Sequence, residues 1–444
     1  MRSADFSMAI AFSPPAGSKS EETPIPGTER STMRTGLAPY KMLDAWRGFA
    51  SLWVVMFHIT EILVQRTPAL STNPIYWFGL QGGLGVQLFF VISGYCILSA
   101  AGSACRASLR GSVTGSGPLA DPVLGTTTRF MWARLRRIFP PFWYALLLTA
   151  LTSLLALWLV ARGVLHESVA ASKVSSSIFY YLANLTLSQV GVGQPCLLGP
   201  SWSLCYELAF YFIIALMLGG SIYWHRSRGT GSTDLETSLL WMSHLLTVAV
   251  LCLLIAKPNK IAYPFDLWFS FGLGALVYDV ARRQIALAQP RIELRSIYLL
   301  LLLLTVGIVV FWIRYPYAVG YLGNGGRLPF LVADLFVFIL IVGRPYDERV
   351  TSWPPVRALG RIGEFSYSLY LTHVVVIGLA TQVLRRLHLP GSGNLLVLVL
   401  VMGVSVLFAR GFYQVCERPF LKTRREEGKE GKKGKKEKKN RDKN

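Results

Sequence analysis

The sequence predicts an all-α polytopic membrane protein with about ten transmembrane helices. Of the 444 residues, 52% are hydrophobic and only 16% are charged, which is less charge than a soluble chain of this length usually carries. Apolar runs of roughly 16–22 residues recur along the chain, and a run of this length can cross a lipid bilayer as a helix. The net charge of +21 is concentrated in the C-terminal tail and beside these runs. Basic residues placed in this way set the orientation of a protein in the membrane, and the pattern argues against nucleic acid as a binding partner.

The predicted spans follow one another along most of the chain. We expect helices at about 45–64, 83–101, 140–161, 203–220, 239–256, 265–281, 296–313, 329–343, 364–383 and 393–414. The run at 178–190 is shorter and contains Asn184 and Gln189, so it could be an eleventh span or a re-entrant or interfacial piece. Ten spans place both termini and most of the Lys and Arg residues in the cytosol, as the positive-inside rule requires. An eleventh span would move the later basic loops outside, so ten is the prediction.

The composition divides the chain into three parts. Residues 1–39 are rich in Ser, Thr, Pro, Gly and charge, and we expect a disordered cytosolic tail there. Residues 40–421 hold the apolar runs and form the transmembrane domain. Residues 422–444 form a polybasic cytosolic tail, which is either simply solvated or adheres to anionic lipid headgroups. Within the domain, the Gly/Ser/Pro-rich stretch 102–125 is expected to be a flexible loop.

The first span carries the strongest functional signal. Asp44, Arg47 and His58 fall on one face, because a helix turns by about 100° per residue, and Arg47 lies about 16 Å from His58 along the axis. Ionisable groups inside a spanning helix are costly and usually mark a functional path. Glu61 follows His58 by three residues and is within reach of the imidazole. Such a histidine can accept and return a proton near neutral pH.

Later segments add further polar side chains. Ser93 and its neighbour Gly94 let another backbone approach their helix closely. Arg134 and Arg137, just before a span, either hold the phosphates of a nucleotide-like ligand or anchor the helix end. Glu207 lies in a span among Trp and Tyr residues, where a carboxyl group is a candidate acid, base or partner of a cation.

Two other features are less decisive. Tyr370 and His373 are three residues apart on one helical face, and a structural histidine is as good an explanation there as a catalytic one. The six cysteines are scattered, with no CxxC pair and no spacing typical of metal ligands, so no metal site is predicted.

Six blocks follow one another between about Lys41 and Phe420. They read LDAWRG with His58, GVQLFFVISGY, RLRRIFPPF, WSLCYELAFY, SYSLYLTH and a closing Glu417-Arg418-Pro419. Together they resemble the acyltransferase-3 family of integral membrane O-acyltransferases. The resemblance implies transfer of an acyl group, by default acetyl, from cytosolic acyl-CoA to a hydroxyl of an extracytoplasmic carbohydrate or glycolipid. One block departs from the family: the usual Asp-Gly-Leu-Arg-Gly reads Asp-Ala-Trp-Arg-Gly here, which keeps the charged pair and adds a bulky indole.

The resemblance also implies a role for each candidate residue. His58 would act as the base or as a transient acyl carrier. The remaining members of the implied catalytic group are Asp44, Arg47 and Glu207, and those of the donor-binding group are Arg134, Arg137 and Ser93. Family members are multi-pass proteins of the plasma membrane, with the bacterial inner membrane favoured. Many carry an external esterase-like domain, and since none follows here, we expect direct acylation of the acceptor or a separate extracytoplasmic partner protein.

A proton-coupled transporter or flippase is the alternative. The same intramembrane charges would then relay protons or line a substrate path. The sequence shows no inverted repeat and no matching pair of Gly/Pro-broken spans, which such transporters often have. Dependence on acyl-CoA separates the two classes, and the acyltransferase is the preferred interpretation.

Overall fold

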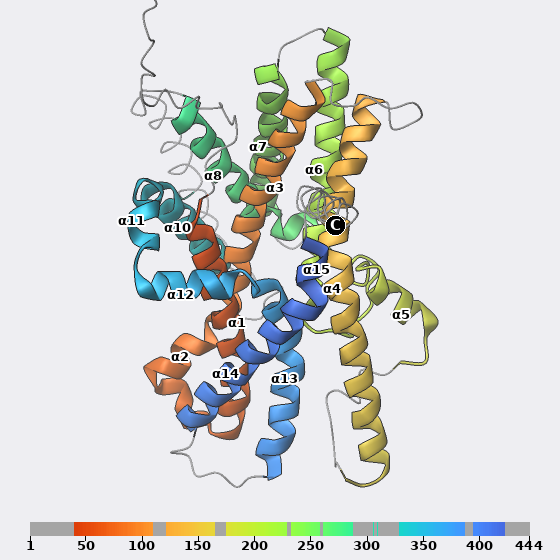
Figure 1. Ribbon diagram of the computed structural model, residues 1–444, viewed down its shortest axis with the longest axis vertical. Helices are drawn as coiled ribbons and strands as arrows, with labels where there is room; N and C mark the ends of the chain where they lie inside the picture. Colours follow the sequence, from red (N-terminus) through yellow and green to blue (C-terminus); the bar gives the residue numbers. More distant parts are fainter. Residues whose placement is uncertain are drawn as a thin grey trace, which may run out of the picture. The chain divides into compact units, whose positions relative to one another are not determined.

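The computed structural model confirms the all-α fold class. It describes residues 40–109, 121–164, 175–228, 232–257, 261–286, 305, 309, 328–386 and 394–421, and every regular element in them is a helix (Figure 1). The longer helices are α1 (Met42–Arg66), α3 (Gly85–Leu109), α4 (Pro122–Ala161), α6 (Ser201–Arg228), α7 (Ser232–Ala256), α8 (Trp268–Ala286), α10 (Leu328–Gly343), α13 (Ser366–Arg386) and α14 (Asn394–Phe412). The shorter ones are α2 (Pro74–Leu80), α5 (Ile178–Leu185), α11 (Asp347–Thr351), α12 (Pro354–Gly363) and α15 (Arg418–Leu421). The two predicted tails, and all but two residues of the predicted span 296–313, lie outside the described residues.

Seven helical segments of the described residues are long and apolar enough to cross a membrane. They are Met42–Arg66, Pro74–Ser108, Pro122–Ala161, Ser201–Arg228, Leu235–Leu254, Ser366–Leu384 and Asn394–Leu421. Helices α8 and α10 form where spans are predicted but are not among the seven, and α10 has only 16 residues. The chain is therefore a multi-pass membrane protein, whereas ten spans and the cytosolic side of both termini stay predictions.

Helix α5 decides between the alternatives for the run at 178–190. It has eight residues, which extend about 12 Å along a helix axis. This is less than half of the roughly 30 Å of a bilayer's hydrocarbon core. The segment is therefore not a spanning helix, and the re-entrant or interfacial alternative is the one that fits.

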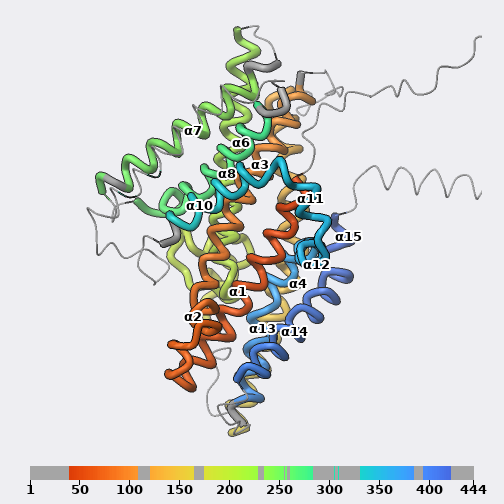
Figure 2. The backbone as a smooth tube through the Cα atoms, turned by 90° about the vertical axis from the view of Figure 1, so that its left-hand side faces the viewer, coloured from red at the N-terminus to blue at the C-terminus, as the bar shows by residue number. Residues whose placement is uncertain are grey.

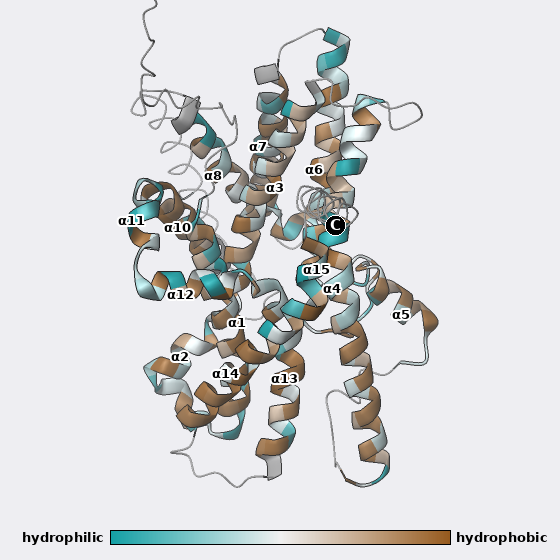
Figure 3. Ribbon diagram, in the orientation of Figure 1, coloured by the Kyte–Doolittle hydropathy of each residue, from teal (hydrophilic) through white to brown (hydrophobic). Residues whose placement is uncertain are grey.

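Helix α4 begins much earlier than predicted. A start near 140 was wrong, because Asp121 caps the helix by accepting from the amides of Val123 and Leu124, and Pro122 suits the first helical position. The loop prediction for 102–125 was likewise wrong at both of its ends, since α3 continues to Leu109. The basic residues thus share one continuous helix with an apolar half. In Figure 3 the first part of α4 mixes teal with paler and brown stretches, whereas its later part is mostly brown.

Helix α1 is central to the packing and runs between α3 on one side and α13 and α14 on the other (Figure 2). Its N-terminus is held by Asp347 of α11, which accepts from the amides of Lys41 and Met42 at 2.9 and 2.8 Å. Helix α12 touches its backbone at Gly48, where an added Cβ would lie 2.0 Å from the carbonyl oxygen of Leu359. These contacts fix the depth and rotation of the helix that carries Arg47 and His58.

Helices α3 and α8 also meet backbone to backbone. A Cβ on Gly94 would lie 2.0 Å from the carbonyl oxygen of Phe271, and a Cβ on Gly274 would lie 2.0 Å from that of Val91. The close approach predicted at Ser93-Gly94 is therefore confirmed. Ser93, the neighbour of Gly94 on α3, faces the site described next.

Candidate functional site

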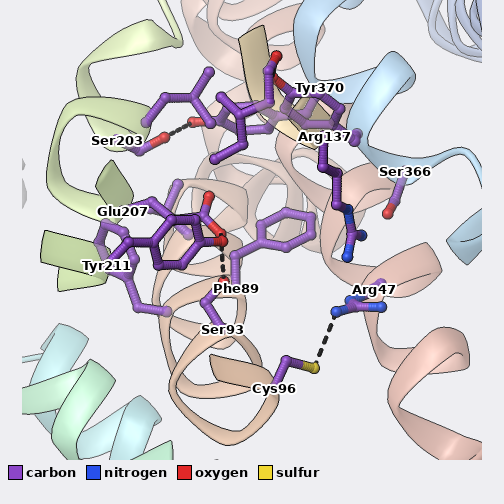
Figure 4. Close-up of a pocket in the computed structure, with 15 residues that line it drawn as sticks. Arg47, Phe89, Ser93, Cys96, Arg137, Ser203, Glu207, Tyr211, Ser366 and Tyr370 are labelled. Atoms are coloured by element: carbon purple, nitrogen blue, oxygen red, sulfur yellow. Dashed lines mark hydrogen bonds between the residues drawn. The ribbon is translucent and has the colours of Figure 1, made fainter. Parts of the chain in front are cut away.

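A cavity of about 110 Å³ lies among α1, α3, α4, α6 and α13 (Figure 4). We call it the arginine cavity, after Arg47 and Arg137. Its lining is Arg47, Val86, Phe89, Phe90, Ser93, Cys96, Arg137, Ile138, Ser203, Leu204, Glu207, Tyr211, Ser366, Tyr367 and Tyr370. Four predicted site residues meet here, and each comes from a different helix: Arg47, Ser93, Arg137 and Glu207.

Two hydroxyl groups hold the carboxylate of Glu207. Ser93 of α3 donates to its Oε1 atom at 3.1 Å, and Tyr211, one turn further along α6, donates to the same atom in a short hydrogen bond. Within the described residues Oε2 has no hydrogen bond. The carboxylate is thus fixed in position with one oxygen available to a ligand.

The arginines lie across the cavity from Glu207 (Figure 4). Arg47 donates to Asp44 Oδ1 at 3.2 Å and to Cys96 Sγ at 3.1 Å. Its side chain is 21% exposed, whereas that of Asp44 is 54% exposed and does not line the cavity. In the part of the chain that the structure describes, Arg137 makes no hydrogen bond or ion pair. Its guanidinium group is therefore available to an anion.

Arg134 lies outside the lining of the arginine cavity. Its guanidinium group stacks 4.2 Å from the centre of the Phe130 ring and donates to the Phe130 carbonyl oxygen at 3.0 Å. The structure thus brings only one of the two predicted donor-binding arginines into contact with the cavity.

His58 lines a second cavity, of about 310 Å³, which we call the histidine cavity. Its lining is Val54, Phe57, His58, Leu80, Gln81, Gly83, Leu84, Val86, Gly199, Pro200, Trp202, Tyr370 and Val374. Val86 and Tyr370 line both cavities, so the two cavities adjoin at these side chains. His58 thus lines a different cavity from Glu207 and Arg47, and we call the two residues common to both linings, Val86 and Tyr370, the partition.

The predicted contact between His58 and Glu61 is confirmed. Nδ1 of His58 lies 3.1 Å from Oε2 of Glu61, and both side chains are partly exposed. With the carboxylate ionised, this contact assigns the proton to Nδ1 and leaves a lone pair on Nε2. The imidazole is therefore arranged to accept a proton.

The sequence left the roles of Tyr370 and His373 of α13 open. The structure places Tyr370 where the two cavities adjoin and His373 against the ring of His58. The His373 ring is fully buried and stacks on His58 with 5.3 Å between ring centres and 28° between planes. Its Nδ1 lies 3.1 Å from the carbonyl oxygen of Leu369. The Tyr370 hydroxyl lies 2.6 Å from Ser203 Oγ and donates to the Pro200 carbonyl oxygen at 3.1 Å. The spacing of Tyr370 and His373 indicated that they share one face of their helix, but it did not indicate which helices that face contacts.

Comparisons with known proteins agree on one family. Residues 40–413 match the family model described as an acyltransferase domain. The Bacillus subtilis (strain 168) protein named "Putative peptidoglycan O-acetyltransferase YrhL" is 27% identical over 399 residues, which cover 85% of this chain and 54% of that protein. The Staphylococcus aureus (strain NCTC 8325) "O-acetyltransferase OatA" is 22% identical over 393 residues, 86% of this chain and 57% of that protein. The chain spans about half the length of these relatives. No solved structure matches it.

Proposed function

Because the chain belongs to the acyltransferase-3 family and is a membrane acyltransferase, we propose that it moves an acetyl group from cytosolic acetyl-CoA to a hydroxyl of an extracytoplasmic carbohydrate or glycolipid. The names of the two relatives support acetyl as the transferred group, and one of them names a carbohydrate polymer. The observation that carries the proposal is the pair of adjoining cavities, one with arginines and one with a histidine.

The arginine cavity suits the phosphate-bearing part of the donor. Guanidinium groups bind phosphate oxygens through paired, charge-assisted hydrogen bonds. Arg137 has its donors free among the described residues, and Arg47 is held toward the same space by Asp44 and Cys96. The bulk of coenzyme A exceeds this cavity, so its nucleotide would remain at the cytosolic mouth. Its thin pantetheine arm would cover the roughly 16 Å along α1 from Arg47 to His58.

The histidine cavity suits proton transfer. Glu61 holds Nδ1–H of His58, so Nε2 accepts the proton of the acceptor hydroxyl as its oxygen attacks the thioester carbonyl carbon. The carbon–sulfur bond then breaks, and the proton returns from His58 to the coenzyme A thiolate. In a second route His58 itself carries the acetyl group between the two substrates. Both routes need His58, and Glu61 supports both by holding the imidazole in place.

We further propose that the protein resides in a plasma membrane, by preference the bacterial inner membrane, since both relatives are bacterial. The donor side would be the cytosol, where both chain termini are predicted to lie. A separate extracytoplasmic partner that passes the acetyl group onward stays a prediction.

Calorimetric titration of acetyl-CoA into the nanodisc-embedded protein tests the donor site. Arg137→Ala should abolish saturable binding, whereas the matched change Arg134→Ala, three residues away and outside the cavity lining, should weaken binding less. Equal losses in both variants would refute the assignment of the arginine cavity. Failure of the folded wild-type protein to bind any acyl-CoA would favour the transporter.

Replacement of His58 tests the chemistry. His58→Ala should bind acetyl-CoA with wild-type affinity and lose acetyl transfer to an acceptor, because its removal leaves the donor cavity intact. Release of coenzyme A, followed with a thiol reagent, measures transfer. A His58→Ala variant that binds acetyl-CoA and still transfers the acetyl group would contradict the proposed role of His58.

A further inference from the structure

We infer that the histidine cavity binds a single uncharged glycosyl unit of the acceptor, stacked on Trp202 and hydrogen-bonded to Gln81 and His58. The inference rests on the proposed function and narrows its acceptor class. It excludes sugars that carry a carboxylate or phosphate at the unit that enters the site.

Charge is the first argument. No Asp, Glu, Lys or Arg lines the histidine cavity among the described residues. An anionic sugar would lose its hydration there without a cation in compensation, which is costly in an apolar pocket. The carboxylate of Glu61, bound to His58, adds repulsion. The two arginines proposed to bind phosphate, Arg47 and Arg137, both line the adjoining cavity. An anionic ligand would therefore bind in the arginine cavity and an uncharged ligand in the histidine cavity.

Aromatic side chains are the second argument. Phe57 of α1, Trp202 of α6 and Tyr370 of α13 contribute rings to the lining. The C–H-rich face of a pyranose packs against such rings, because both surfaces are apolar and flat. The Trp202 ring is held by an edge contact with Tyr206 at 6.0 Å and 86°, so its orientation is fixed before a ligand arrives.

Free polar groups are the third argument. Gln81 directly follows α2, and its side-chain amide makes no hydrogen bond within the described ranges, so it offers both donors and an acceptor. Nε2 of His58 adds an acceptor. Sugar hydroxyls both donate and accept, and this set matches them. The cavity of about 310 Å³ is at the lower end of the range for small-molecule sites, which suits one ring of a glycan.

Methyl β-glucoside and methyl β-glucuronide form a matched pair of probes that differ in a carboxylate. Saturation-transfer NMR with the nanodisc-embedded protein measures their binding without any acyl transfer, so the result is independent of the proposed chemistry. The glucoside should bind saturably and the glucuronide at least about tenfold more weakly. Equal binding of both, or no saturable binding of either, would overturn the inference.

Two variants locate the bound sugar. Trp202→Ala should weaken the glucoside about fivefold, because one stacking surface is lost. Trp77→Ala is the matched control, since Trp77 is 59% exposed and lies outside the cavity lining. A loss confined to Trp77→Ala, or the same loss in both variants, would place the sugar elsewhere and contradict the inference.

Competition distinguishes the sources of the glycosyl unit. Octyl β-glucoside, kept below its micellar concentration, should displace methyl β-glucoside. Displacement at the same concentration as methyl β-glucoside itself indicates a glycan end, and displacement at a much lower concentration indicates a lipid-borne sugar. Failure to displace would contradict a shared site for the uncharged unit.

Discussion

The backbone contact between α3 and α8 gives a quantitative test of the structure, through the variant Gly94→Ala. The new Cβ would lie 2.0 Å from the Phe271 carbonyl oxygen and 3.0 Å from the Cα atom of Gly274. Ordinary contacts begin at 3.4 Å, so the helices must separate by about 1.4 Å, the difference between 3.4 and 2.0 Å. The opposing atoms are backbone and cannot rotate away.

Overpacking of a well-packed interior typically costs about 1–3 kcal/mol, and a rigid opposing backbone puts this variant near 3 kcal/mol. Ser93 adjoins Gly94 and donates to Glu207 across the arginine cavity. A shift of α3 should therefore weaken acetyl-CoA binding as well as lower the free energy of unfolding. The two effects should appear together in one variant.

Thermal unfolding by circular dichroism and acetyl-CoA titration, both in nanodiscs, measure these effects. Gly403→Ala and Gly378→Ala are the controls, because an added Cβ meets nothing within 4 Å at either position. Both controls should unfold at or above the wild-type temperature, since alanine favours helix over glycine. If Gly94→Ala matches the controls in stability and donor affinity, α3 and α8 do not pack as the structure shows.

Three further changes separate the parts of the site. Glu61→Gln should lower the transfer rate about tenfold with unchanged acetyl-CoA affinity, because it removes the negative charge of the side chain that contacts His58. Steady-state kinetics measures the rate, and titration measures the affinity. Asp44→Asn should weaken acetyl-CoA binding no more than about fivefold, because the Asp44 side chain in its ion pair with Arg47 is about half exposed. A loss of affinity as large as that of Arg137→Ala would contradict a minor role for Asp44. Val86→Ala widens the partition and should raise the rate with propionyl-CoA relative to acetyl-CoA, measured by coenzyme A release.

Features that depend on a single helix could be predicted from the sequence. The apolar runs identify most of the helices, and the spacing of His58 and Glu61 determines their contact because both lie on α1. That another backbone can approach Gly94 follows from the absence of a side chain there, whereas the sequence did not identify α8 as that neighbour. In each case the physical cause is local, either helical periodicity or the lack of a Cβ atom.

Features that depend on how helices are rotated against one another could not be predicted. Arg134 and Arg137 are three residues apart on α4, yet only Arg137 lines the arginine cavity. The same holds for His373, which is remote in sequence from His58 but stacks on its ring. Periodicity specifies the face of a helix, whereas the neighbour of that face is set by packing between helices.

The partition between the cavities constrains how the proposed reaction proceeds. Tyr370 is fixed on its side by hydrogen bonds to Ser203 and Pro200, whereas Val86 presents an apolar side chain with no polar bond to hold it. Under the proposed roles the acyl group passes these two side chains, because the phosphates are held in the arginine cavity and His58 lines the adjoining one. A passage bounded by a fixed ring favours a short acyl group. The apolar Val86 side chain offers no partner to a charged acyl group, so under these roles the partition would favour a short, uncharged acyl group such as acetyl.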